Sequence, residues 1–295
     1  MVHQVKATLD HPIKYMQHNG RTSMDTEVNL RLEEHCKSIG FPVGVYDIDK
    51  LDETGFAAAR NDTFGASDSA VLLGVAYSSR NVTMKTKDEL LNEKVNNFWN
   101  EEISSKASVR KGKDLEVPII VPKLEEMLNA YVLKPKDMYV NKKGLATNFD
   151  GVLFEAEIND EDLIIGYHPV PLEIKVCTVW ARKNYDWNKA VSEFDKDIKL
   201  EIPKDLPLRE GIPIEEHIEL KATHFGIPKY YYTQLQQQIM FLGADHGHLA
   251  VMDDSEWTIY IFTVPRDDVV IKALEIESFH QYARLCKKKG LPMPK

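Results

Sequence analysis

The segment from Gly151 to Val179 constrains the fold more than any other part of the sequence. It holds three short runs rich in β-branched and other apolar residues, which are 151–158, 162–166 and 171–179. Turn residues, Asn159-Asp160 and His168-Pro169, separate these runs. Short apolar runs bounded in this way are typical of β-strands. The segment therefore predicts a meander of antiparallel strands in the middle of the chain.

Helical patterns lie on both sides of these strands. The predicted helices are 25–39, 67–74, 87–100, 117–131, 230–243 and 267–288, and two further strands are predicted at 248–252 and 257–264. In the helix at 230–243, Leu235, Ile239 and Leu242 follow helical spacing and form its buried stripe. This order of elements predicts an α/β (α+β) architecture with a central mixed β-sheet flanked by helices.

Composition narrows the class of protein. The 295 residues carry 37 Lys and Arg against 46 Asp and Glu, and the net charge of −9 argues against a nonspecific polycation. No run approaches 18 apolar residues and the first residues lack a signal-peptide pattern, so neither a membrane span nor secretion is expected. Three widely spaced cysteines form no disulfide or metal-clip pattern. We therefore expect an intracellular protein, of the cytoplasm or the nucleus.

The chain shows no internal repeat and no linker that would divide it cleanly. Residues 1–55 are predicted to be an N-terminal extension that is acidic and partly helical. Residues 56–295 are predicted to form a single domain. A polar, acid-leaning stretch with several prolines indicates an insertion around 181–229.

Glu173 and Lys175 are the first candidate site residues. On a strand they are two positions apart and point to the same face, whereas Leu172, Ile174 and Val176 point to the other. Such a pair is often an exposed salt bridge. Here Asp150 and Glu116 could converge on it, and three converging carboxylates repel one another unless a divalent cation neutralises them. Mg²⁺ suits such oxygen ligands, with Mn²⁺ as the alternative.

Four segments occur in a recognisable order. They are Arg60-x6-Ser67, Gly112-Lys-Asp-Leu-Glu116, Asp150 followed by Glu173-Ile-Lys175, and Tyr231-Tyr-Thr-Gln-Leu-Gln-Gln-Gln-Ile-Met240. Together they resemble the lambda-exonuclease/YqaJ-like viral recombinase family of the PD-(D/E)xK nuclease superfamily. The resemblance covers roughly residues 56–264 and implies a restriction-endonuclease-like core.

The resemblance implies a role for each residue of the central motif. Glu116, Asp150 and Glu173 would be metal ligands, joined by the backbone carbonyl of Ile174. Lys175 would be the catalytic lysine, which orients a water or helps to deprotonate it. The separation of 23 positions between Asp150 and Glu173 is longer than the tight hairpin usual for the motif. Glu155 and Glu157 on the intervening strand are therefore rival ligands.

The resemblance also implies a phosphate site. Arg60, Ser67 and Gln234 would hold the terminal 5′-phosphate or the phosphates at the cleaved end, with Gln238 beside them. A helix N-terminus at Ser67 would attract an anion, and Arg60 can bind one with two hydrogen bonds. The alternatives are that Ser67 is an ordinary N-cap, that Arg60 is a surface charge, and that both glutamines lie on a solvated helix face.

Basic residues cluster around the predicted metal site. Lys111 and Lys113 precede Glu116 within an acid-free run, and further lysines precede Asp150, whereas much of the acid excess lies in residues 1–62 and 181–219. This distribution predicts an electropositive DNA-binding channel on an acidic body.

Asp245-His-Gly-His248 is a further candidate for metal binding, because two imidazoles two positions apart can share an ion. No Cys or second His pair lies nearby in the sequence. We therefore predict that this segment is a loop between a helix and a strand.

The resemblance implies a metal-dependent DNA exonuclease. It would act 5′→3′ on double-stranded DNA ends and hydrolyse phosphodiester bonds in recombination, repair or viral DNA processing. Its expected partners are duplex DNA with free ends, a single-strand annealing protein and further copies of the chain. The alternatives are a structure-specific or restriction-like endonuclease, an RNA-degrading nuclease, and a catalytically inactive DNA-binding or assembly module.

Overall fold

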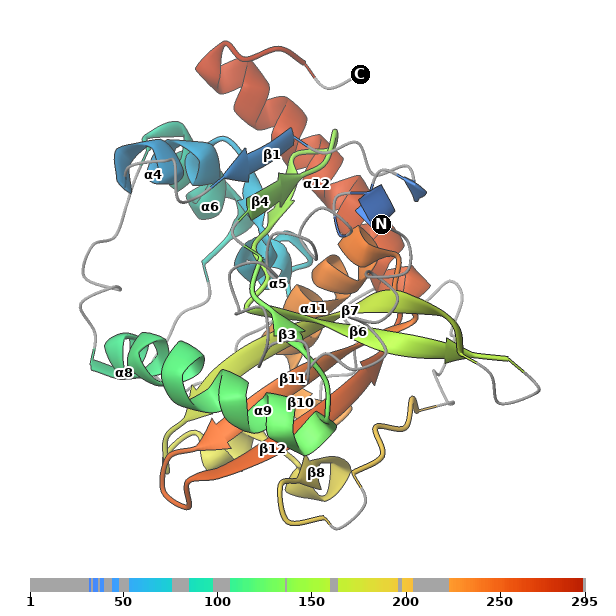
Figure 1. Ribbon diagram of the computed structural model, residues 1–295. Coiled ribbons are helices and arrows are strands. Elements are labelled where there is room, and N and C mark those ends of the chain that lie inside the picture. Colours follow the sequence, from blue (N-terminus) through green and yellow to red (C-terminus); the bar gives the residue numbers. More distant parts are fainter. Residues whose placement is uncertain are drawn as a thin grey trace.

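The computed structural model (Figure 1) describes residues 44–47, 53–75, 85–97, 107–135, 137–159, 164–195, 198–203 and 223–293, together with part of 32–39. The predicted helix at 25–39 lies largely outside the described residues, and all of 204–222 lies outside them. Among the described helices, none is long and apolar enough to cross a membrane. The three cysteines are buried and form no disulfide.

A six-stranded sheet forms the centre of the fold. Its order is β3-β6-β7-β11-β12-β8, with β3 Val132–Leu133, β6 Gly151–Ile158, β7 Ile164–Cys177, β11 His246–Asp253, β12 Thr258–Pro265 and β8 Val191–Ser192. All neighbours are antiparallel except β7 and β11, which are parallel. The predicted mixed sheet is therefore confirmed, whereas the purely antiparallel meander covers only β6 and β7.

Strand β7 corrects one sequence prediction. The residues His168 and Pro169, expected to form a turn, lie inside this continuous 14-residue strand. Pro169 and Pro171 pair with Phe154 and Val152 of β6, while the ladder to β11 begins only at Leu172. A proline lacks an N–H to donate, and here its nitrogen can face the side that β11 does not cover.

Helices cover both faces of this sheet (Figure 1). On one face, α11 (Lys229–Leu242) and α12 (Asp268–Lys289) contribute Leu235, Ile239 and Leu274 to a core with Leu249 and Val251 of β11. On the other face lie α8 (Ala107–Leu115), the π-helical turn η3 (Glu116–Ile120) and α9 (Val121–Leu128). Residues of η3 and α9 pack there against alternate residues of β7 and β11. Because α11 connects β7 to β11, it positions its side chains directly above the catalytic candidate strand.

A second sheet and three helices pack beside α11 and α12. The strands follow the order β1-β4-β5-β2, with β1 Gly44–Asp47, β4 Asp137–Val140, β5 Leu145–Thr147 and β2 Phe64–Gly65. The helices are α4 (Glu53–Asn61), α5 (Ser69–Leu72) and α6 (Lys87–Val95), and the 3-10 turn η2 (Ala66–Asp68) precedes α5. A short hairpin of β9 (Thr223–His224) and β10 (Ile227–Pro228) leads into α11. The strands of this second sheet were not predicted from the sequence.

Part of the predicted N-terminal extension packs on the domain. Leu32 and Cys36 are buried in the core, and His35 Nε2 lies 2.7 Å from the Leu242 carbonyl oxygen. Within the predicted insertion, residues 182–184 (η4) and 187–189 (η5) form 3-10 turns and β8 adds an edge strand. The boundary at residue 55 and the insertion around 181–229 stay predictions.

Candidate active site

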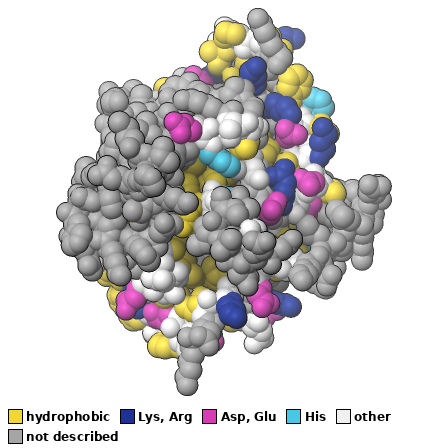
Figure 2. Space-filling view, turned by 45° about the vertical axis from the view of Figure 1, so that its right-hand side comes forward, with side chains coloured by type: hydrophobic (Ala, Val, Ile, Leu, Met, Phe, Trp, Pro, Cys, Tyr) yellow, Lys and Arg dark blue, Asp and Glu magenta, His cyan; other side chains and the backbone are white. Residues whose placement is uncertain are grey.

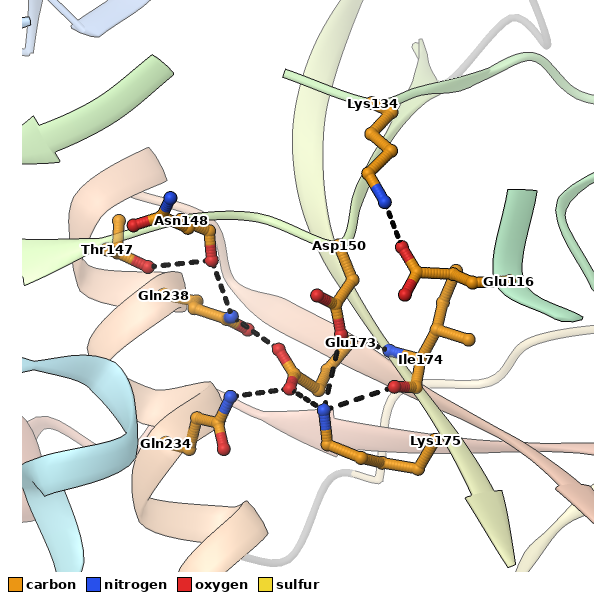
Figure 3. Close-up of polar contacts among 10 residues, drawn as sticks. All are labelled: Glu116, Lys134, Thr147, Asn148, Asp150, Glu173, Ile174, Lys175, Gln234 and Gln238. Atoms are coloured by element: carbon orange, nitrogen blue, oxygen red, sulfur yellow. Dashed lines mark hydrogen bonds and ion pairs between the residues drawn. The ribbon is translucent and has the colours of Figure 1, made fainter. Parts of the chain in front are cut away.

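Strand pairing brings Asp150, Glu173 and Lys175 together. Gly151, the first residue of β6, pairs with Leu172 of β7, so Asp150 lies beside Glu173 (Figure 3). Asp150 Oδ2 accepts a hydrogen bond from the Ile174 backbone N–H at 3.1 Å and lies 3.3 Å from Lys175 Nζ. The 23-residue separation therefore reflects two long strands that return to the same point.

Glu173 is a buried carboxylate with three side-chain donors. Its exposed fraction is 2%, and it accepts hydrogen bonds from Lys175 Nζ, Gln234 Nε2 and Gln238 Nε2, the last at 2.6 Å. Burial raises the pKa of Glu173 to about 7, and the negative charge of Asp150 acts in the same direction. A second positive charge beside this carboxylate would stabilise its ionised form.

Lys175 lies between the two carboxylates. Its Nζ also donates to the Ile174 carbonyl oxygen at 3.1 Å and is 5.5 Å from the centre of the Tyr231 ring. Burial by itself would lower the pKa of Lys175, but the charges of Asp150 and Glu173 outweigh it and raise the pKa. Lys175 is thus an ammonium group at neutral pH. It can donate hydrogen bonds and supply positive charge, but it is a poor base.

Glu116 approaches from the end of α8, where the helix passes into η3. It forms an ion pair with Lys134 (Figure 3). Burial raises the pKa of Glu116, and the charge of Asp150 raises it further. The carboxylate oxygens of Glu116, Asp150 and Glu173 do not all lie within 4.8 Å of one another. Lys175 and Lys134 supply the positive charge among them.

The chemistry of these donors fits a divalent cation. Burial and the negative charge of Asp150 raise the pKa values of Glu116 and Glu173. The Ile174 carbonyl adds a neutral oxygen to the same group. A hard ion with oxygen ligands would relieve this repulsion once Lys175 Nζ moves aside. Lys134 also contacts Glu116. The sequence placed this lysine only in a basic cluster before Asp150, because the two residues are 18 positions apart in the chain.

Gln234 and Gln238 do not lie on a solvated helix face, which was one interpretation of their spacing. Gln238 is fully buried, as are Gln236 and Gln237, so this face of α11 is not solvated. Gln234 and Gln238 both donate to Glu173, and Gln237 Nε2 donates to the Phe64 and Ala146 carbonyl oxygens. Helical spacing alone could not distinguish buried amides from exposed ones, because both lie off the apolar stripe.

Arg60 and Ser67 lie around Gly65. A Cβ atom added at Gly65 would be 3.8 Å from Ser67 Oγ and 4.0 Å from an Arg60 guanidinium nitrogen. The expected helix N-terminus at Ser67 is a single 3-10 turn, η2, followed by the four-residue α5. Ser67 is exposed, and η2 packs on α11. The two side chains are thus brought together, but the helix-dipole argument for an anion no longer applies.

Three of the basic residues in these clusters are paired with acids. Lys111 Nζ lies 2.8 Å from Asp254 Oδ2, Lys143 Nζ lies 2.6 Å from Glu275 Oε1, and Lys134 pairs with Glu116. Figure 2 shows one face on which Lys and Arg side chains lie among Asp and Glu side chains. The side chain of Lys113 lies outside the described residues. Lys111, Lys134 and Lys143 therefore do not form an electropositive channel of unpaired cations.

The rival ligand Glu155 points away from this site. It pairs with His168 across β6 and β7, on the same face as Leu172 and opposite to Glu173. There it contacts His246 and His248 of β11, which begins at His246, so the strand predicted at 248–252 starts two residues earlier and replaces most of the predicted loop. The side chain of Glu157 is outside the described residues.

Comparison with known proteins agrees with this fold and motif. The chain resembles in structure an alkaline exonuclease (LHK-Exo) from Laribacter hongkongensis, with a TM-score of 0.50 and 15% sequence identity over 80% of this chain and 93% of that chain. The structure of LHK-Exo in complex with dAMP gives a TM-score of 0.49 and 18% identity over 79% and 92%. No curated protein sequence matches this chain.

The fold is the restriction-endonuclease-like fold of PD-(D/E)xK proteins. The sequence profile of the YqaJ-like viral recombinase domain matches residues 55–245, well over half of the chain. The chain belongs to this family.

Proposed function

We propose that the chain is a metal-dependent deoxyribonuclease that degrades double-stranded DNA 5′→3′ from free ends. The observation that carries the proposal is the arrangement of Asp150 and Glu173 around Lys175, in a chain of the YqaJ-like family. The similarity to an alkaline exonuclease supports the same class of reaction. A single-strand annealing partner and self-association stay predictions.

Glu116, Asp150 and Glu173 and the Ile174 carbonyl are the proposed ligands of Mg²⁺, with Mn²⁺ as the alternative. When bound, the ion supplies Lewis acidity and positive charge to the phosphate that is cleaved. Gln234 and Gln238 hold the Glu173 carboxylate, so it is oriented before substrate arrives. Preorganised ligands of this kind need no rearrangement during the reaction.

Lys175 contributes as a cation. In hydrolysis the oxygen of a water forms a bond to phosphorus and loses a proton to solvent, the P–O3′ bond breaks and the 3′-oxygen takes up a proton, while negative charge develops on the phosphate oxygens. The Lys175 ammonium can donate a hydrogen bond to the attacking water or to these oxygens, and its positive charge stabilises them. Arg60 and Ser67 are proposed to bind the 5′-phosphate, with the partly exposed Gln234 beside them.

The test uses linear duplexes with a 5′-phosphate or a 5′-hydroxyl, a covalently closed circle and a matched RNA, each with Mg²⁺. We expect release of mononucleotides from linear DNA only, faster with the 5′-phosphate. Cutting of the circle would establish an endonuclease, preference for RNA an RNA-degrading enzyme, and binding without turnover an inactive module.

Variants test the roles of the residues. Lys175→Ala should lower the rate by about 10²–10³-fold, the scale of losing one preorganised donor, while leaving DNA binding in place. Glu173→Gln tests the ligand with less disturbance than Glu173→Ala, which would remove the shared acceptor of Lys175, Gln234 and Gln238. Lys272→Ala, an exposed lysine on α12, is the matched control. Undiminished Mg²⁺-dependent digestion by Lys175→Ala or Glu173→Gln would refute the assignment.

A further inference from the structure

A second group of potential ligands lies on the face of the sheet opposite to Glu173. Glu155 of β6, His168 of β7 and His246 of β11 each offer one ligand atom, and these atoms all lie within 4.8 Å of one another. The three strands are neighbours in the sheet, so each contributes one side chain to one point. Strand pairing thus supplies the additional ligands that the sequence near His246 and His248 lacks.

The distances agree with a compact metal site. Glu155 Oε2 lies 3.1 Å from His246 Nε2 and 3.8 Å from His168 Nε2. In a tetrahedral zinc site with bonds of about 2.0–2.2 Å, neighbouring donor atoms lie roughly 3.3–3.5 Å apart. Small rotations of the side chains would therefore bring the three donors to bonding distance of one ion.

His246 is the independent indication of a ligand. Its exposed fraction is 2%, its Nδ1 has no hydrogen-bond partner among the described residues, and its Nε2 has only the Glu155 carboxylate, 3.1 Å away. A buried polar atom without a hydrogen bond is costly and usually has a specific explanation. Coordination of an ion by His246 would provide one.

His248 contacts the other oxygen of the Glu155 carboxylate. Its Nε2 lies 2.8 Å from Glu155 Oε1, and its Nδ1 lies 3.2 Å from Thr263 Oγ1 of β12. This contact occupies one carboxylate oxygen and leaves Oε2 directed at His246 and His168. Outer partners of this type orient the ligands of metal sites.

We propose that Glu155, His168 and His246 bind Zn²⁺, with His248 as the positioning residue and a water as the fourth ligand. Two imidazoles and a carboxylate favour zinc over the hard ion proposed at Glu173. The ladder between β7 and β11 begins with the pair of Leu172 and His248. The ion would therefore link the two strands next to this pair, where the ladder itself does not extend. This site does not depend on the proposed nuclease activity.

The test is zinc stoichiometry of the full-length protein. The protein is stripped with EDTA, exchanged into buffer with millimolar Mg²⁺ to occupy the carboxylate site, titrated with Zn²⁺ and measured by elemental analysis and calorimetry. We expect about one equivalent of tightly bound Zn²⁺ and a raised Tm. Co²⁺ in place of Zn²⁺ should give the visible absorption of a tetrahedral site.

Matched variants localise the ion. His168→Ala and Glu155→Gln change partly exposed side chains and should weaken Zn²⁺ binding by at least the roughly 10–100-fold typical of losing an outer partner. His280→Ala, an exposed histidine on α12, and Glu173→Gln should keep wild-type affinity. Circular dichroism verifies that each variant is folded. Absence of tight Zn²⁺ binding by the wild type, or wild-type affinity in folded His168→Ala, would overturn the proposal.

Discussion

Glu173 couples the proposed chemistry to the stability of the fold. Its carboxylate is removed from water, yet three side chains donate to it and Asp150 repels it. In the metal-free protein, this environment stabilises the neutral form of the Glu173 carboxyl relative to the unfolded chain. A bound divalent cation would stabilise its ionised form. The protonation state of the metal-free protein therefore differs from that of the unfolded chain.

The first prediction concerns pH. The pKa of Glu173 rises from about 4.5 to about 7 on folding, so the folded state binds the proton more tightly between these values. This contribution to the free energy of unfolding is complete below pH 4.5 and is lost as pH rises through 7. Its size is on the order of 1–3 kcal/mol.

Urea unfolding in EDTA between pH 5 and pH 8 measures this loss. Glu173→Gln removes the titrating group, and its unfolding should show a flatter pH dependence than that of the wild type. If both proteins follow the same pH dependence, Glu173 does not titrate in this range.

At the scale of elements, α11 is a helix whose buried face is both apolar and polar. Leu235 and Ile239 pack on the sheet, while Gln237 crosses to the second sheet and accepts a hydrogen bond from Ser69 Oγ at 2.6 Å. Gln237 also donates to carbonyl oxygens of β2 and β5. The helix thus joins the two sheets through amides as well as through apolar contacts.

The second prediction follows from this junction. Gln237→Leu keeps the size of the side chain but leaves two carbonyl oxygens and a hydroxyl without this partner. We expect the free energy of unfolding to fall by about 2–4 kcal/mol. Chemical denaturation measures the change, and Gln234→Leu is a control whose main effect should be on cleavage. An unchanged unfolding midpoint for Gln237→Leu would contradict the role assigned to this amide.

The sequence was sufficient for elements whose own residues decide their structure. Strand β6 and helix α11 were predicted nearly to the residue, because alternation or helical spacing is strong in both. The division of β7 into two strands was wrong. A strand can contain Pro169 where no neighbour pairs with that edge, and this depends on where the ladder to β11 begins. The environments of Gln238 and His246 likewise depend on strands far away in the sequence. Motif spacing predicted that Asp150, Glu173 and Lys175 meet, but not that Lys175 separates the two carboxylates.

For the whole molecule, net charge and local pairing together limit DNA binding. The chain carries −9, and Lys111, Lys134 and Lys143 are held by acids on the protein itself. In the proposed function, these three lysines would therefore attract DNA less than unpaired cations do. Each phosphate contact still releases counterions, so affinity depends on salt.

The third prediction separates these cations. In EDTA, Arg60→Ala should reduce the magnitude of the slope of log affinity against log salt by about 0.9, the value for one phosphate contact. Lys111→Ala should reduce it by clearly less, because Lys111 lies on α8 and contacts Asp254, outside the proposed pocket of Arg60 and Ser67. Fluorescence anisotropy with a 5′-phosphorylated duplex measures both slopes. Equal reductions by the two variants would contradict the proposed phosphate pocket.

The parallel pairing of β7 with β11 affects how the protein is made. Leu172 and His248 are neighbours in the sheet but are 76 positions apart in the chain. During synthesis β7 and its hairpin partner β6 emerge well before β11, so the edge that carries Glu173 and Lys175 is uncovered while the chain grows. Exposed strand edges promote association between chains, and charged side chains and prolines oppose it. Glu173 and Lys175 place charge on the part of β7 that β11 later covers, and the two prolines lie on the part outside this ladder, so both features oppose such association.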